Sequence, residues 1–264
     1  MPDFFVGLPC EAQALLATLF TWAVTAAGAA VVFLVKRPRR LFMDGMLGFS
    51  AGVMLAASYW SLLDPAIELS AQMHSNAWLT PLAGLLAGGI LLYMGDRIYQ
   101  FLHSRKTNQS MEKRCALLLT SITLHNIPEG MAVGVAFGCL AYGLEGATLS
   151  AACMLALGIG LQNLPEGTAV SAPLLRERYT KKRAFLYGML SGIVEPIAGV
   201  LGALLVLRVR PLLPFMLSFA AGAMIYVVTE ELIPESQQNR HKAAMTFFTL
   251  AGFAVMMVLD VALG

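Results

Sequence analysis

The chain has 264 residues, of which 58% are hydrophobic and only 13% are charged, and its mean hydropathy is +0.70. Soluble domains carry about 25% charged residues, so this composition excludes an ordinary water-soluble fold and predicts an all-α integral membrane protein. The net charge of +2 is too small to predict a nucleic-acid partner. The first residues include Asp3 and Glu11 rather than a basic stretch, so no cleavable signal peptide is expected.

Eight apolar segments are each long enough for a helix to cross a bilayer core, which takes about 20 residues. They are residues 13–35, 43–63, 77–101, 115–141, 149–175, 184–207, 212–234 and 243–263. The connections between them are short. The sequence therefore predicts one transmembrane domain over residues 1–264, surrounded by lipid.

Basic residues lie almost entirely on one side of this eight-span arrangement. If both termini are outside, all but two of the 18 Lys and Arg fall on or beside the inner loops, the exceptions being Arg208 and Arg210. Basic residues gather on the cytoplasmic side of membrane proteins. We therefore expect a multi-pass protein of a cell membrane with both termini extracytoplasmic. The compactness of the chain favours the bacterial inner membrane.

Two segments of the chain resemble each other in opposite orientations. Residues 46–55 read MLGFSAGVML and open the second span, and residues 216–225 read MLSFAAGAMI and open the seventh, with six of ten positions identical. The second span runs outward and the seventh runs inward. This predicts an inverted repeat of spans 1–3 and 6–8 around central spans 4 and 5, a plan that many transporters share. Chance similarity between helices rich in Gly, Ala and Met is the alternative.

The two central spans carry near copies of one polar motif. Residues 125–130 read HNIPEG and residues 162–167 read QNLPEG. In each motif the first residue and the Glu are four apart, which puts them on one face of a helix. Because the two spans are antiparallel, we expect His125 level with Glu166, and Glu129 level with Gln162.

A proline lies beside each mid-membrane glutamate of these motifs. Pro128 and Pro165 remove backbone donors, which we expect to free the carbonyl oxygens of Leu124 and Leu161. Such irregular backbone is tolerated at membrane depth only against protein or a water-lined path. Glu195 with Pro196 repeats the pairing in the middle of the sixth span.

Ionisable residues at membrane depth are costly, and a divalent cation bridging them explains their presence. Three carboxylates (Glu129, Glu166 and Glu195), the imidazole of His125 and several amides suit Zn²⁺ or Fe²⁺, and also Mn²⁺, Co²⁺ or Cd²⁺. We therefore predict a transporter whose substrate is a divalent transition metal. No organic cofactor is expected.

At these residues the chain resembles the ZIP (Zrt/Irt-like) family of divalent metal transporters. The resemblance rests on HN-x-PEG in span four, x-N-x-PEG in span five, Glu-Pro in span six and the eight-span layout, and it covers essentially the whole chain. The QNLPEG form of the second motif is similar to the GufA-type bacterial branch.

The resemblance implies a two-metal transport site and zinc uptake toward the cytosol. One metal would use His125, Glu129, Gln162 and Glu166. The other would use Asn126, Glu129, Asn163, Glu166 and Glu195. It further implies that spans 1, 4, 5 and 6 move against a wall of spans 2, 3, 7 and 8 that forms a homodimer.

The chain departs from the family pattern at three places. Gln162 stands where many relatives have His, and Asn163 stands where some have Asp. Both replacements reduce the ligand strength or the negative charge of the site. They therefore disfavour the binding of two metals at once and a strict preference for zinc. The loop of residues 103–114 holds only His103 where many relatives have a His-rich segment.

Further polar residues lie near the span ends. Ser61, Asp64 and Glu68 at the outer end of span two are candidates for an acidic entry funnel. Glu230, Glu231 and Glu235 at the inner end of span seven are candidates for an exit relay. Ordinary interfacial residues at helix ends are the alternative for both groups.

Two other functions remain open at this stage. A proton or monovalent-cation channel would use the same carboxylates as a relay. An intramembrane metalloenzyme would need an open metal position and a general base, but the chain has no HExxH string and only one mid-membrane His.

Overall fold

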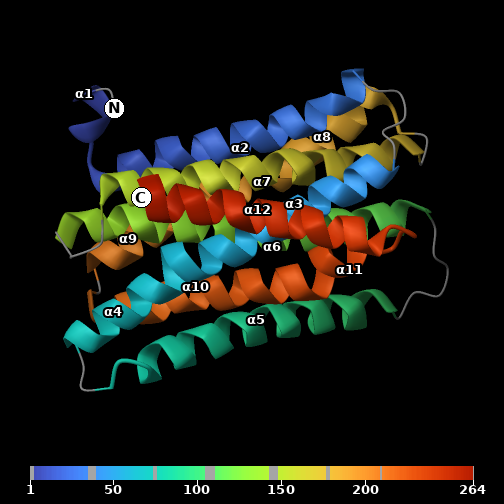
Figure 1. Ribbon diagram of the computed structural model, residues 1–264. Helices are drawn as coiled ribbons and strands as arrows, with labels where there is room; N and C mark the ends of the chain where they lie inside the picture. Colours follow the sequence, from blue (N-terminus) through green and yellow to red (C-terminus); the bar gives the residue numbers. More distant parts are fainter. Residues whose placement is uncertain are drawn as a thin grey trace.

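The structure is a computed structural model that describes residues 3–34, 40–73, 76–104, 111–142, 148–176, 179–208 and 210–263. All regular elements within these ranges are helices, so the all-α prediction is confirmed. The helices form one elongated bundle, and the two termini lie at the same end of it (Figure 1).

Within the described residues, helices cover most of each of the eight predicted segments. In chain order the elements are α1 (Asp3–Val6), α2 (Cys10–Leu34), α3 (Arg40–Ala57), η1 (Ser58–Leu63), α4 (Asp64–Met73), α5 (Leu79–Ser104), α6 (Met111–Cys139), η2 (Leu140–Tyr142), α7 (Leu149–Arg176), α8 (Lys181–Ser191), α9 (Val194–Arg208), η3 (Arg210–Leu212), α10 (Leu213–Val227), η4 (Val228–Leu232), α11 (Ile233–Ser236), α12 (Lys242–Val258) and η5 (Leu259–Leu263).

Five of these helical runs are long and apolar enough to cross a membrane. They are Cys10–Leu34, Leu41–Met73, Lys181–Val206, Leu213–Ser236 and Lys242–Ala262. The chain is therefore a multi-pass membrane protein, while the count of eight spans stays a prediction.

Several predicted spans contain a departure from regular α-helix. The elements η1, η4 and η5 are π-helical and continue α3, α10 and α12 without a break. The sixth predicted span is divided into α8 and α9 by a turn at Gly192 and Ile193, which lies before Pro196 rather than at it. Pro196 then lies in the first turn of α9, where the backbone N–H groups have no partners within the helix and a proline is tolerated.

Four helix pairs make the most extensive contacts: α2 with α7, α6 with α9, α3 with α12, and α5 with α10. Glycines bring the backbones of each pair together. A Cβ atom built on Gly134 of α6 would lie 2.7 Å from the carbonyl carbon of Gly199 on α9, and one on Gly167 of α7 would lie 2.9 Å from the backbone nitrogen of Ala29 on α2. Small residues allow this close approach, which drives helix association inside membranes.

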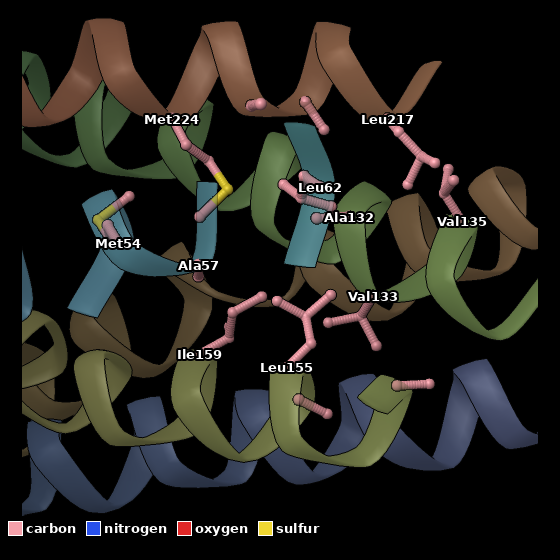
Figure 2. Close-up of a cluster of buried hydrophobic side chains, with 14 of the residues drawn as sticks. Met54, Ala57, Leu62, Ala132, Val133, Val135, Leu155, Ile159, Leu217 and Met224 are labelled. Atoms are coloured by element: carbon pink, nitrogen blue, oxygen red, sulfur yellow. The ribbon is translucent and has the colours of Figure 1, made fainter. Parts of the chain in front are cut away.

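We divide the helices into a first group whose members contact one another extensively and a second group made of the α3–α12 and α5–α10 pairs, which pack against the first. The first group contains α2, α6, α7, α8 and α9, and the second contains α3, α5, α10 and α12. They meet where α3 packs on α7 and α10 packs on α6. Figure 2 shows the apolar side chains at this interface, which include Met54, Val133, Ile159 and Met224 and are fully or almost fully buried.

Candidate metal site

Three carboxylates lie in the interior of the first helix group. Glu129 on α6 and Glu195 on α9 are 0% exposed, and Glu166 on α7 is 6% exposed. Burying three acidic groups together is unfavourable unless hydrogen bonds or a cation compensate them.

The motif helices stay helical through their prolines. Both α6, which contains Pro128, and α7, which contains Pro165, continue without interruption. The backbone irregularity lies instead at Gly192 and Ile193, just before Glu195. Irregular backbone therefore accompanies the site in span six, as expected. The breaks expected at Pro128 and Pro165 are absent from the two motif helices.

Glu129 and Gln162 face each other, as their depths predict. Gln162 Nε2 donates a hydrogen bond of 2.6 Å to Glu129 Oε1. The other oxygens of the pair, Glu129 Oε2 and Gln162 Oε1, are buried and accept no hydrogen bond from any described residue.

Glu195 is held by donors from two helices. Asn163 Nδ2 on α7 lies 3.0 and 2.9 Å from its two carboxylate oxygens. Thr21 on α2 donates to Oε2 at 2.5 Å, and Thr25 one turn later lies 3.3 Å from Oε1. Asn163 Oδ1 is buried and lacks a donor among the described residues.

The remaining members of the predicted set have separate partners. Asn126 Nδ2 donates to the carbonyl oxygen of Ser191, the last residue of α8, at 2.9 Å, while Asn126 Oδ1 is buried with no donor in the described part of the chain. Ser50 of α3 donates to Glu166 Oε1 at 3.1 Å and lies 3.2 Å from the carbonyl oxygen of Gln162. His125 lies on α6, but its side chain is outside what the structure describes.

Four buried oxygens of the predicted ligand residues thus accept no hydrogen bond from the described residues. They are Asn126 Oδ1, Glu129 Oε2, Gln162 Oε1 and Asn163 Oδ1. Buried polar atoms almost always have a partner, so these four need one. A divalent cation fits them, because carboxylate and amide oxygens are metal ligands.

The carboxylates themselves are not gathered into a compact cluster. Among the residues described, no group of three or more His, Cys, Asp and Glu side chains is close enough to hold a metal ion. Hydrogen bonds from Gln162 and Asn163 hold Glu129 and Glu195 instead. The amide oxygens are therefore as important to the site as the carboxylates.

Sequence reasoning did not identify Ser50, Thr21 or Thr25. Serine and threonine are common in apolar helices and pack there without any ligand. The only available signal was the position of Ser50 inside the repeated segment 46–55. The threonines lie about 170 residues from Glu195, and no motif spacing connects them.

The predicted pathway residues lie away from this site. Ser61 in η1 donates to Asp260 Oδ1 in η5 at 2.6 Å, a partner that the sequence did not indicate. Asp64 at the start of α4 is half-buried and Glu68 is exposed. In η4, Glu230 is exposed and Glu231 is half-buried.

Known proteins resemble this chain over most of its length. The profile of the ZIP zinc transporter family matches residues 103–260. The chain is 38% identical to zinc transporter ZIP11 of Homo sapiens over 96% of this chain and 97% of that protein. It is 37% identical to zinc transporter ZIPB of Bordetella bronchiseptica over 92% of this chain and 79% of that protein.

A third relative belongs to the branch that the second motif indicated. Zinc transporter GufA of Myxococcus xanthus is 34% identical over 95% of this chain and 98% of that protein. These identities extend well beyond the two motifs. The chain belongs to the ZIP family of zinc transporters, including its GufA-like branch, and is a transporter rather than an enzyme.

Proposed function

We propose that this protein carries zinc across a cell membrane toward the cytosol through the site between α6, α7 and α9. The observation that carries the proposal is the set of four buried oxygens without donors among the described residues, all on residues of the duplicated motifs. The relatives named zinc transporters support zinc as the substrate. Fe²⁺, Mn²⁺, Co²⁺ and Cd²⁺ are proposed as further substrates, because oxygen ligands discriminate weakly among divalent metals.

The ligand set we propose contains His125, Asn126, Glu129, Gln162, Asn163, Glu166 and Glu195. Glu129 and Glu166 would serve each bound metal, with His125 and Gln162 on one and Asn126, Asn163 and Glu195 on the other. The anchored amides support this set, since each NH₂ group has an acceptor and each amide oxygen is left for a cation.

The inverted repeat of spans 1–3 and 6–8 is part of the proposal. Exchanging the two halves converts the α2–α7 pair into the α9–α6 pair, and the α3–α12 pair into the α10–α5 pair. In addition, η1 begins twelve residues after Met46 and η4 begins twelve residues after Met216. Both regularities favour two related halves within eight spans.

An outward closure of the site is also proposed. The stretches of α6 after its motif and of α7 before its motif lead to the end of the bundle that carries the termini (Figure 1). They contain the buried apolar side chains of Ala132, Val133, Leu155 and Ile159 (Figure 2). With the basic loops cytoplasmic, this apolar layer separates the site from the outside, and a cation would leave inward.

Lipid and a second copy of the chain are the proposed partners of the outer surface. Leu82, Leu86 and Ile90 expose an apolar stripe on α5. Lipid tails cover such a stripe, and the wall that includes α5 is where a homodimer would form.

Zinc uptake into proteoliposomes tests the function. We expect wild-type protein to accumulate ⁶⁵Zn and the Glu129→Ala variant to lose at least about 90% of that rate, because removing one buried ligand costs several kcal/mol of ion binding. Gln13→Ala, which removes a buried amide bonded to the Phe5 carbonyl, serves as the control and should retain uptake. Unchanged uptake in Glu129→Ala would contradict the site. Proton flux without any dependence on metal would favour a channel.

A further inference from the structure

Glu195 has donors near both of its carboxylate oxygens, whereas Glu129 accepts at one oxygen only. Its two oxygens have four donor contacts, two from Asn163 and one each from Thr21 and Thr25. A carboxylate offers about four lone-pair positions, so these contacts occupy it. A cation that binds Glu195 therefore has to displace at least one donor.

The two threonines have a second acceptor on their own helix. Thr21 Oγ1 lies 3.0 Å from the carbonyl oxygen of Thr18, and Thr25 Oγ1 lies 3.3 Å from the carbonyl oxygen of Thr21. A hydroxyl carries one hydrogen and rotates freely, so it donates to one acceptor at a time. A buried donor without an acceptor costs free energy. When the hydroxyl hydrogen turns from Glu195 to the carbonyl oxygen on α2, it keeps an acceptor, so this cost does not arise.

Close packing brings these short side chains within reach. Thr21 and Thr25 are 0% and 2% exposed. Gly167 on α7 lets α2 approach, since a Cβ there would lie 3.0 Å from the carbonyl carbon of Thr25. Gly192 leaves room for the carboxylate, because its Cβ would lie 3.0 Å from Glu195 Oε1.

We propose that Thr21 and Thr25 are positioning residues that form a displaceable cover on Glu195 and thereby set how tightly the transported cation is held. The hydroxyls satisfy the carboxylate while the site is empty. When a divalent cation takes Glu195, the hydroxyl hydrogens turn to the carbonyl oxygens of Thr18 and Thr21. The hydroxyls compete with the cation, so they weaken its binding and favour its release. This inference rests on the proposed function of the site.

Zinc binding to the purified full-length protein in nanodiscs tests the cover. The Thr21→Val/Thr25→Val variant keeps the side-chain shape but removes both hydroxyls. We expect its zinc Kd, measured by competition with a fluorescent chelator, to fall about threefold to tenfold, the range set by the net worth of a hydrogen bond. Thr21→Ser/Thr25→Ser retains the donors and should bind zinc like the wild type.

Two further variants separate this effect from a purely structural one. Thr168→Val removes a buried hydroxyl that donates to the Gly28 carbonyl at the same α2–α7 contact, and its zinc Kd should not change. In a Glu195→Gln background the valine substitutions should no longer tighten zinc binding.

Unchanged or weaker zinc binding in the double valine variant would overturn the cover even though wild-type protein binds zinc. If the wild type itself binds no zinc, the proposed function fails and the cover with it. If the double variant does not fold, Thr25→Val alone gives the same comparison.

Discussion

At the scale of single residues, three amide side chains have a fixed orientation in the candidate site. Asn126 donates to the Ser191 carbonyl, Gln162 to Glu129, and Asn163 to Glu195. These acceptors cannot donate in their carbonyl or ionised forms, so each NH₂ group must face them and each amide oxygen must face elsewhere. The result is a set of buried amide oxygens whose orientation the protein fixes, as the proposed metal site requires.

Gln162→His tests whether amide ligation sets metal preference. An imidazole N–H still donates to Glu129, and its other nitrogen becomes a ligand that suits zinc better than manganese. We expect the ratio of zinc to manganese uptake in competition experiments to rise on the order of tenfold. The same substitution at Gln13, which is buried at the start of α2, should leave the ratio unchanged. An unchanged ratio in Gln162→His would place Gln162 outside the metal's ligands.

Some contacts of the candidate site could be predicted from the sequence and others could not. The Gln162–Glu129 contact was predictable, because two antiparallel spans of known depth leave little choice of level. The Glu195 contacts were not, because helix packing brings Thr21 and Thr25 to it and no local pattern encodes that packing. Ser50 likewise reaches Glu166 only through the α3–α7 contact.

At the scale of elements, glycines lie at the close backbone contacts of the four main helix pairs. The apolar segments indicated where the helices lie, and helices cover most of each predicted segment within the described residues. The break in span six was expected near Pro196 but lies at Gly192 and Ile193, because a helix accommodates proline in its first turn. That break puts Glu195 in the first turn of α9, where the helix dipole favours a negative charge.

Gly134→Ala tests the backbone contact between α6 and α9. The added methyl group would overlap the Gly199 backbone, and overpacking of this kind costs about 1–3 kcal/mol. We expect a lower unfolding temperature in a thermal scan of the detergent-solubilised protein. Gly95→Ala on α5 meets no atom within 4 Å, so its unfolding temperature should match or exceed that of the wild type. Equal stability of both variants would contradict the close approach.

Across the whole molecule, both termini lie at one end of the bundle (Figure 1), as an even number of spans requires. The predicted orientation puts that end outside the cell, because all but two of the Lys and Arg residues fall on or beside the loops predicted to lie inside. The fold class followed from composition and charge, whereas the division of the helices into two groups depends on long-range packing that the composition does not contain.

Cysteine labelling in intact cells tests this orientation. In a background without the native cysteines, a membrane-impermeant maleimide should label Trp78→Cys, since Trp78 is 60% exposed at the predicted outer end. It should label Gln238→Cys, exposed between α11 and α12, only after the cells are permeabilised. The reverse pattern would invert the topology and the proposed direction of transport.

The glycine contacts within helix pairs have a mechanical consequence. Where two backbones touch, no side chain stands between them to rearrange, so the paired helices behave as one stiff unit. The seam between the two groups is different. Apart from the hydrogen bonds of Ser50 to α7, Met54, Ile159 and Met224 meet there through dispersion and hydrophobic contacts that have no preferred direction. If one helix group slides along the other, apolar contacts at the seam are replaced by other apolar contacts of similar energy. We therefore expect a change of shape to require least work along the layer of Figure 2, with the helix pairs moving intact on either side of it.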